Sequence, residues 1–180
     1  MKVNEIFYSL QGEGYYAGTP AVFVRFSGCN LSCPFCDTNH VDGHQLTEEE
    51  IVDEVNRFPA SHVVITGGEP GLQLTASLVD RFHAAGKFVQ IETNGTCMLP
   101  EEIDWVTCSP KEGGRLAVSR IDELKVVYVG QELSKFEAME VKVHSLQPCS
   151  CKNTNEVVDY ILKHPIWRLS LQTHKLIHVR

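Results

Sequence analysis

Short apolar runs recur along the chain, and most of them are followed by a polar loop. The clearest runs, which we predict to be β-strands, are residues 21–26, 63–66, 88–93, 105–108, 123–129 and 141–146. A further strand is expected at residues 167–172. Because several of these runs alternate with helical segments, the pattern predicts a parallel sheet built from βα units.

Three segments carry apolar residues at helical spacing. Thr47 and Glu50 form a capping-box pattern that starts the first helix, whose apolar face includes Ile51 and Val55. The other two helices are expected at about residues 74–85 and 155–164. The polar segments between strands and helices are then the places where a site can form.

The chain length limits the architecture. A complete eight-fold TIM barrel needs roughly 250 residues, whereas this chain has 180. We therefore predict one domain, residues 1–180, of the α/β class: a partial, open TIM-like barrel of about six parallel strands and about three helices. A flavodoxin-like open sheet is the alternative, since both folds place their sites at the carboxyl ends of the strands.

Composition excludes several classes of function. The net charge is −7, from 16 basic and 23 acidic residues, which argues against a general nucleic-acid surface. No apolar run is long enough to span a membrane, and the first residues do not resemble a signal peptide. We therefore expect a cytoplasmic protein whose seven cysteines stay reduced, which favours metal binding over disulfides.

Cys29, Cys33 and Cys36 follow the first predicted strand in a Cys-x3-Cys-x2-Cys arrangement. Three thiolates at this spacing can ligate three irons of a 4Fe-4S cluster, which leaves one iron without a protein ligand. Such an open position can bind and activate a small molecule, as it does in catalytic zinc sites. A structural zinc site normally has four Cys or His ligands, so the triplet favours a cluster.

The next three predicted strands also end in polar motifs, at residues 66–70 (TGGEP), 92–95 (ETNG) and 109–111 (SPK). Because parallel strands end at a common rim, we expect these motifs to converge with the cysteines. Gly67 and Gly68 allow a ligand to approach the backbone, and Glu69 offers a negative charge to a cationic amine. Considered alone, this segment is more simply explained as an ordinary strand-to-helix turn, with Pro70 near the helix start.

The cysteine spacing and the Gly-Gly-Glu-Pro loop resemble those of the radical S-adenosylmethionine (SAM) enzymes. Within that superfamily, the chain resembles the 7-carboxy-7-deazaguanine synthases of the deazapurine branch that leads to queuosine. The resemblance covers residues 7–14 (FYSLQGEG), 25–38 (RFSGCNLSCPFCDT), 66–70, 92–96, 109–111 and 171–175 (LQTHK). It implies a radical SAM core with a 4Fe-4S cluster, SAM and Mg²⁺ as cofactors.

The resemblance also implies roles for individual residues. The substrate-binding residues are Leu10, Gln11, Gly12, Arg25, Thr66 and His174. The SAM-binding residues are Phe35, Cys36, Asp37, Gly68, Glu69, Ser109, Pro110 and Lys111. The metal ligands are Cys29, Cys33 and Cys36 for the cluster and Thr38 for Mg²⁺. Arg25 suits a substrate carboxylate because a guanidinium can bind it bidentately, and Glu13 is a candidate for proton transfer.

The implied reaction is the Mg²⁺-dependent ring contraction of 6-carboxy-5,6,7,8-tetrahydropterin to 7-carboxy-7-deazaguanine with loss of ammonia. The implied partners are this small-molecule pterin, a one-electron reductant such as flavodoxin and a second copy of the chain in a homodimer. Neither a nucleic acid nor a membrane is implied.

Alternatives stay open at this point. A glycyl-radical-enzyme activase shares the cysteine spacing but acts on a protein, and the segment Leu10–Gly14 together with Arg25 argues against it. A non-catalytic iron–sulfur or zinc module is the second alternative. Cys149 and Cys151 could ligate another metal or form a redox pair, although ordinary thiols are favoured because no neighbouring pair completes four ligands. His174 is equally consistent with a histidine at the end of a strand that faces solvent.

Overall fold

Seven described strands run parallel to one another and form most of one sheet. The computed structural model describes residues 1–34, 36 and 38–179. The parallel strands are β2 (Pro20–Phe26), β4 (His62–Gly67), β5 (Phe88–Thr93), β6 (Trp105–Cys108), β7 (Glu123–Tyr128), β8 (Val143–Pro148) and β9 (Trp167–Leu169). They match the predicted runs to within one residue at each end, with two exceptions: β8 lies two residues later than the predicted run 141–146, and the last strand ends at Leu169 instead of residue 172.

Two antiparallel strands at one edge were not predicted. β1 (Lys2–Leu10) pairs with β2, and the short β3 (His44–Gln45) pairs with β1. The register of β1 shifts between Val3 and Glu5. A bulge of this kind interrupts the alternation of apolar and polar residues, which is why the sequence pattern does not predict this strand.

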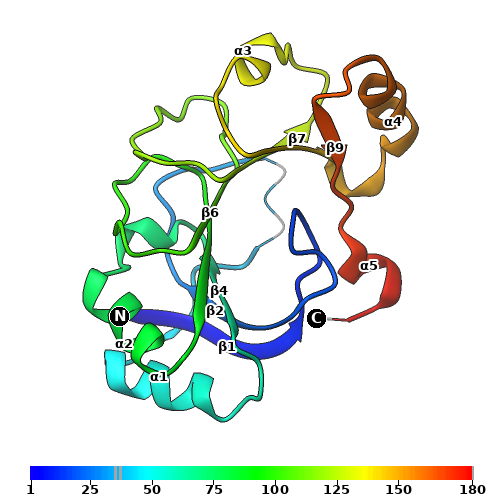
Figure 1. The fold of residues 1–180 in the computed structure, drawn as a ribbon. Helices are drawn as coiled ribbons and strands as arrows, with labels where there is room; N and C mark the ends of the chain where they lie inside the picture. Colours follow the sequence, from blue (N-terminus) through cyan, green and yellow to red (C-terminus); the bar gives the residue numbers. More distant parts are fainter. Residues whose placement is uncertain (35, 37, 180) are drawn as a thin grey trace.

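The sheet is open, as the sequence predicts. Its strand order is β3-β1-β2-β4-β5-β6-β7-β8-β9, and within the described part of the chain no ladder joins β3 to β9. Figure 1 shows the strands curving around the middle of the molecule, with helices on the outside. This arrangement is the predicted partial TIM-like barrel, and it excludes two separate sheets.

The three longer helices occur where their periodicity predicts them. They are α1 (Glu48–Asn56), α2 (Ala76–Ala84) and α4 (Thr154–Lys163). At the start of α1 the capping box is complete: the Thr47 hydroxyl accepts from the Glu50 N–H, and the Glu50 carboxylate accepts from the Thr47 N–H. None of the helices in the described residues has the length and apolar character needed to cross a membrane.

The shorter helical segments were not predicted. They change the predicted start of the second helix and the structure expected around His174. They are α3 (Ser134–Glu137), α5 (Thr173–Ile177) and the 3₁₀ turns η1 (Pro70–Leu72) and η2 (Cys149–Cys151). Because η1 precedes it, α2 begins at Ala76, where Thr75 caps it, and not at Leu74. His174 lies in the first turn of α5, so the expectation of a strand-end histidine is wrong.

Alternate residues of the strands make two different faces. The face that packs against α1 and α2 is apolar, and its strand residues include Val24, Ile65 and Ile91. Leu124, Val126 and Leu146 pack in a second cluster with Val157 of α4. Both apolar clusters lie on the same side of the sheet, which we call the outer face. The opposite side is the inner face. Polar residues dominate the inner face from β5 to β8: Gln90, Glu92, Thr107, Glu123, Lys125, Ser145 and Gln147.

The loop between β1 and β2, residues 11–19, crosses the inner face. Its Gln11 side chain donates to Glu92 on β5, and its Tyr15 N–H donates to Glu123 on β7. Gly14 has a φ of +69°, and a Cβ there would lie 2.7 Å from a Glu123 carboxylate oxygen, so only glycine fits. Figure 1 shows this loop, drawn in blue, beside the red segment that leads to α5.

Candidate active site

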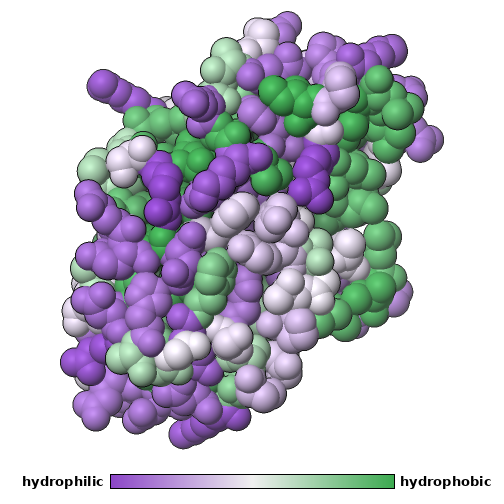
Figure 2. Space-filling model, in the orientation of Figure 1, coloured by the Kyte–Doolittle hydropathy of each residue, from purple (hydrophilic) through white to green (hydrophobic). Residues whose placement is uncertain are grey.

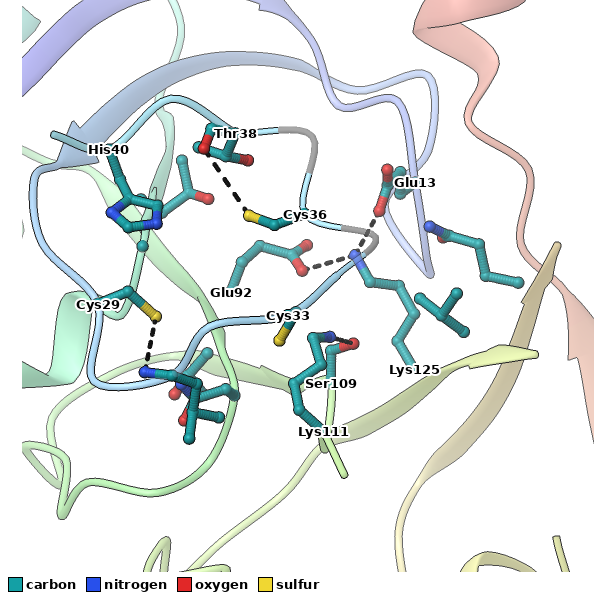
Figure 3. A pocket seen from close by; sticks show the side chains of 18 of the residues that line it. Glu13, Cys29, Cys33, Cys36, Thr38, His40, Glu92, Ser109, Lys111 and Lys125 are labelled. Atoms are coloured by element: carbon teal, nitrogen blue, oxygen red, sulfur yellow. Dashed lines mark hydrogen bonds and ion pairs between the residues drawn. The ribbon is translucent and has the colours of Figure 1, made fainter. Parts of the chain in front are cut away.

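The cysteine triplet and the predicted SAM-binding motifs meet at one rim of the barrel. They line a pocket of about 200 Å³, which we call the cysteine pocket. Its lining includes Cys29, Cys33, Cys36, Thr38, Thr66, Gly68, Ser109 and Lys111. Figure 3 shows the labelled side chains among them pointing toward one another from the loops that follow β2 and β6. The rim thus brings together motifs that are far apart in the sequence.

The donor set suits an iron–sulfur cluster with three protein ligands. Cys29 Sγ accepts a hydrogen bond from the Leu31 N–H at 3.5 Å, so one thiol is already oriented by its own loop. Within the described residues, no three His, Cys, Asp or Glu side chains gather closely enough to hold one metal ion. The three cysteines line one pocket, and three thiolate ligands suit an iron–sulfur cluster with one open iron, whereas a structural zinc ion takes four ligands.

Gly68 is needed for the contact between the Gly-Gly-Glu-Pro turn and the cysteine loop. A Cβ at this position would lie 2.1 Å from the Gly28 carbonyl oxygen and 2.7 Å from Cys29 Cβ. The Glu69 N–H also donates to the Gly28 carbonyl at 2.9 Å. The turn after β4 therefore holds the start of the cysteine loop against the rim.

The predicted substrate-binding residues surround a second pocket, which we call the arginine pocket. All six of them line this space of about 220 Å³: Leu10, Gln11, Gly12, Arg25, Thr66 and His174. Arg25 Nε donates to Glu5 at 2.9 Å, and its guanidinium lies 5.7 Å from the centre of the Phe7 ring. A Cβ on Gly12 would overlap the His174 ring, so α5 packs directly on the β1–β2 loop.

A buried group of charges separates the two pockets and lines both of them. Lys125 Nζ lies 2.7 Å from a Glu13 oxygen and 2.6 Å from a Glu92 oxygen. The Lys125 side chain is 6% exposed, and Figure 3 shows it between the two carboxylates. Glu13, Glu92 and Lys125 each line both pockets, as do Thr38, Thr66 and Gln172. These residues can therefore face two ligands at once.

The shared lysine gives its two carboxylates different pKa values. Burial raises the pKa of Glu92 to about 7, although the charge of Lys125 opposes the shift. Burial acts in the same direction on Glu13, but the Lys125 charge and hydrogen bonds from Lys125 and Gln172 outweigh it and lower the pKa to about 2. Burial alone would lower the pKa of Lys125, yet its two carboxylate partners raise it.

Sequence reasoning missed the lysine and did not single out Glu92. Lys125 lies two residues after Glu123 in a strand that is otherwise apolar, so both charged side chains face the same side of the sheet. A strand in the middle of a parallel sheet is normally apolar on both faces. Two charges at this spacing were therefore the available signal for a polar barrel interior.

Other predicted SAM contacts lie away from the cysteine pocket. Glu69 is fully buried, and its carboxylate accepts hydrogen bonds from the Gly71 N–H, the Thr93 hydroxyl and the Asn94 N–H. Neither Glu69 nor Pro110 is among the residues that line the pocket. Glu69 thus joins the turn after β4 to the end of β5, and its contact with SAM stays a prediction. Phe35 and Asp37 lie outside the described residues.

The cysteines outside the triplet differ in their surroundings. Cys108 is fully buried, and burial raises its pKa to about 12, as expected for an inert thiol. Cys149 lines the cysteine pocket, together with Gln147, Pro148 and Ser150 at the end of β8. This segment was not predicted to belong to the site, and its only sequence signal was its place after a predicted strand.

Comparison with known proteins gives consistent results. Residues 23–106 match the model of the Radical SAM superfamily. A 7-carboxy-7-deazaguanine synthase from Bacteroides thetaiotaomicron is 62% identical over 179 residues, covering 99% of this chain and 98% of that protein. One from Bradyrhizobium diazoefficiens is 42% identical, with coverages of 99% and 98%. The crystal structure of QueE from Escherichia coli aligns with a TM-score of 0.81 at 32% identity, covering 96% of this chain and 94% of that one.

Proposed function

Since the chain belongs to the 7-carboxy-7-deazaguanine synthase family of the radical SAM superfamily, we propose that it contracts the ring of 6-carboxy-5,6,7,8-tetrahydropterin. The product is 7-carboxy-7-deazaguanine and the leaving molecule is ammonia, so the enzyme is a carbon–nitrogen lyase. The observation that carries this proposal is the pair of adjoining pockets, which share the Glu13–Lys125–Glu92 group.

The cofactors are a 4Fe-4S cluster and SAM, which supply the one-electron chemistry when they are bound. Cys29, Cys33 and Cys36 hold the cluster, and the open edge of the cysteine pocket accepts SAM. Lys111 lies in this pocket and donates to the Ser109 hydroxyl; burial lowers its pKa, but the nearby Cys33 and Glu13 oppose this shift and favour the cation. Its cationic side chain is therefore placed to neutralise negative charge near the cluster.

The pterin is held in the arginine pocket by complementary charge. Arg25 pairs with the substrate carboxylate, because its guanidinium can offer parallel N–H donors. Its pairing with Glu5 and its position over the Phe7 ring hold the side chain in place before the substrate arrives. The hydroxyl of Thr66 and the ring of His174 complete the lining of this pocket.

Proton transfer is better matched to Glu92 than to Glu13. A group with a pKa near 7 can take up and release a proton at neutral pH, whereas Glu13, at about 2, stays ionised. We therefore assign proton transfer to Glu92, and we assign to Glu13 the task of holding Lys125. In Glu13→Gln the limb of the pH profile that reports Glu92 should remain but move to lower pH, because the Glu13 charge helps to raise the pKa of Glu92; loss of that limb would reverse the division.

Thr38 is the proposed Mg²⁺ ligand. It lines both pockets, so an ion bound there can also contact oxygen atoms of the substrate. Magnesium accepts such a mixed set of protein, water and substrate oxygens. Thr38→Val removes the hydroxyl with little change in volume, and it should weaken the dependence of turnover on added Mg²⁺.

Anaerobic turnover tests the function directly. The cluster-loaded protein, the pterin, SAM and a strong one-electron reductant are combined with and without Mg²⁺, and the deazapurine is measured by chromatography. Formation of 7-carboxy-7-deazaguanine is expected, faster with Mg²⁺. If SAM is cleaved but no deazapurine forms, the substrate assignment is wrong while the radical SAM class stands. Cys33→Ala, which removes one cluster ligand, is the inactive control.

The remaining proposals concern assembly and location. We propose that residues 1–180 act as one domain, that a flavodoxin-type protein supplies the electron, and that the reducing cytoplasm keeps the cysteines as thiols. A homodimer is supported by exposed apolar side chains around α4, β9 and α5, a region where Figure 2 shows hydrophobic surface along one side. These side chains are Leu162, Ile166, Leu169, Leu176 and Ile177. Light scattering of the protein and of Leu176→Asp would test this interface.

A further inference from the structure

A buried glutamine, Gln90, connects His62 at the start of β4 to the active-site carboxylate Glu92. Gln90 lies on β5 two residues before Glu92 and is 0% exposed. Its side chain bonds to Glu92 at 3.2 Å, to the Thr107 hydroxyl at 3.2 Å and to His62 at 2.8 Å. Each of these partners lies on the inner face of the sheet.

The contacts fix the orientation of the Gln90 amide. An ionised Glu92 accepts hydrogen bonds only, so the NH₂ group of Gln90 must face it. The amide oxygen then faces His62 Nε2, which must carry the proton. Edge-to-face contacts with Tyr16 and tilted packing on Phe88 hold the His62 ring, with centroids 4.9 Å apart in both cases. Burial lowers the pKa of His62, which keeps the ring neutral.

Gln90 differs from the other donors to Glu92 in its position. Gln11 donates to the same carboxylate oxygen, and Lys125 donates to the other one. Both of these side chains line the pockets, so a ligand can displace them. Gln90 lines neither pocket. Its hydrogen bond therefore persists while ligands enter and leave.

We propose that Gln90 is a positioning residue for the Glu92 carboxylate and that His62, by donating to Gln90, holds the amide in the required orientation. The inference deepens the proposed function, because it concerns how the carboxylate that faces the pterin is held. A fixed carboxylate presents one oxygen to the substrate in a constant direction. A freely rotating one would lose this preorganisation each time a ligand displaced Gln11 or Lys125.

Three substitutions test the connection. His62→Leu removes the donor to Gln90, and Gln90→Met removes the donor to Glu92 at nearly constant volume. His62→Gln restores an N–H donor in place of the imidazole and should rescue the connection. His144→Leu is the matched control, since His144 is 7% exposed like His62 but bonds to the Phe136 carbonyl on the outer face.

The first measurement is the affinity of the cluster-loaded protein for the carboxytetrahydropterin under anaerobic conditions without SAM. His62→Leu and Gln90→Met should each weaken binding about tenfold, as expected for one hydrogen bond to a charged group. His62→Gln and His144→Leu should stay within about twofold. In a Glu92→Gln background, His62→Leu should have no further effect, because the coupling passes through Glu92. An equal loss in that background, or an equal loss in His144→Leu, would overturn the proposal.

The second measurement needs no substrate, so it separates this inference from the proposed function. The infrared carboxyl band that disappears in Glu92→Gln is titrated in each variant. Loss of the Gln90 donor should raise the apparent pKa of Glu92 in Gln90→Met and His62→Leu, but not in His62→Gln or His144→Leu. The charged groups that face Glu92, namely Glu13, Glu123 and Lys125, are unchanged in all four variants. An unshifted titration in Gln90→Met would refute the positioning role even if the pterin binds.

Discussion

The two faces of the sheet are made by alternate residues of the same strands, yet they obey different rules. On β7, Leu124 and Val126 are buried in an apolar cluster, while Glu123 and Lys125, which alternate with them, are buried among polar and charged groups. The apolar side needs only the right volume, because dispersion and burial do not depend on direction. The polar side needs a specific partner for every group. The inner face should therefore tolerate far fewer substitutions than the outer face.

Lys125→Met should give the largest effect, because it leaves Glu13 and Glu92 buried without their shared cation. Removing one member of a buried ion pair costs about 3–5 kcal/mol of unfolding free energy. Urea unfolding measures the loss, and pterin binding should fail as well. Lys163→Met on α4, where the side chain is exposed, is the control and should stay within about 0.5 kcal/mol of the parent. A small loss in Lys125→Met would mean that the two faces do not differ in this way.

Leu124→Ala is the neighbouring change on the outer face. Leu124 is 0% exposed, and truncating a buried leucine costs about 2–5 kcal/mol through lost burial and the cavity left behind. At a temperature where the variant stays folded, its affinity for the pterin should equal that of the parent. A marked loss of affinity would show that the outer face also controls the geometry of the site.

Glu92→Gln should change how stability depends on pH. In the folded protein the pKa of Glu92 is raised from 4.5 to about 7, so between these values the folded state holds more protons than the unfolded state. The raised pKa of Glu92 thus stabilises the folded state fully below pH 4.5, and this stabilisation is lost as the pH rises toward 7. This contribution amounts to about 1–3 kcal/mol, and it should be absent in Glu92→Gln.

Glu13 supplies the opposite slope and so provides the internal control. Its pKa is lowered to about 2, so its stabilisation is present above 4.5 and is lost as the pH falls toward 2. Unfolding free energies measured across the acid and neutral ranges for the parent, Glu92→Gln and Glu13→Gln should separate the two contributions. Glu92→Gln should leave the acid slope in place, whereas Glu13→Gln should remove it and also move the neutral slope to lower pH, because the Glu13 charge helps to raise the pKa of Glu92. Retention of the acid slope in Glu13→Gln would contradict the assignment.

Ile91→Val should give the smallest effect. Ile91 lies on the outer face between Gln90 and Glu92 and is fully buried. Loss of one methyl group costs about 1 kcal/mol, and turnover should not change. Gln90→Met changes the neighbouring residue on the inner face, so the two variants compare the two faces within one strand. Reduced turnover in Ile91→Val would contradict the difference between the faces.

Much of the parallel sheet was predictable, because each strand is a short apolar run that follows a turn or a helix. The long helices were predictable for a similar reason, and the complete capping box at Thr47 is the best example. β1 was not, because its bulge interrupts the alternation that identifies a strand. α5 was not predictable either, because it is only five residues long and has no side-chain cap at its start. It is held instead by contacts with the β1–β2 loop, such as the hydrogen bond from the Thr173 N–H to the Gly12 carbonyl.

The site divides in the same way. The cysteines and the motif residues were predictable, since each lies directly after a strand and parallel strands share a rim. Lys125 was harder to predict, because its importance arises from Glu13 and Glu92, which precede it by 112 and 33 positions. Gln90 also escaped notice, since an isolated glutamine inside a strand carries no sequence signal until its neighbours across the sheet are known.

The β1–β2 loop also has a consequence for the order in which the site is assembled. Glu13 bonds to Gln172, 159 positions later, and Gly14 bonds to Ser170, 156 positions later. The residues that line the cysteine pocket from Cys29 to Lys111 are synthesised well before these partners. Contacts of such long range form late and slow the folding of the whole chain. The β1–β2 loop can thus reach its final place only after almost all of the chain has emerged, and both pockets are completed at that point, because Gln172 lines each of them.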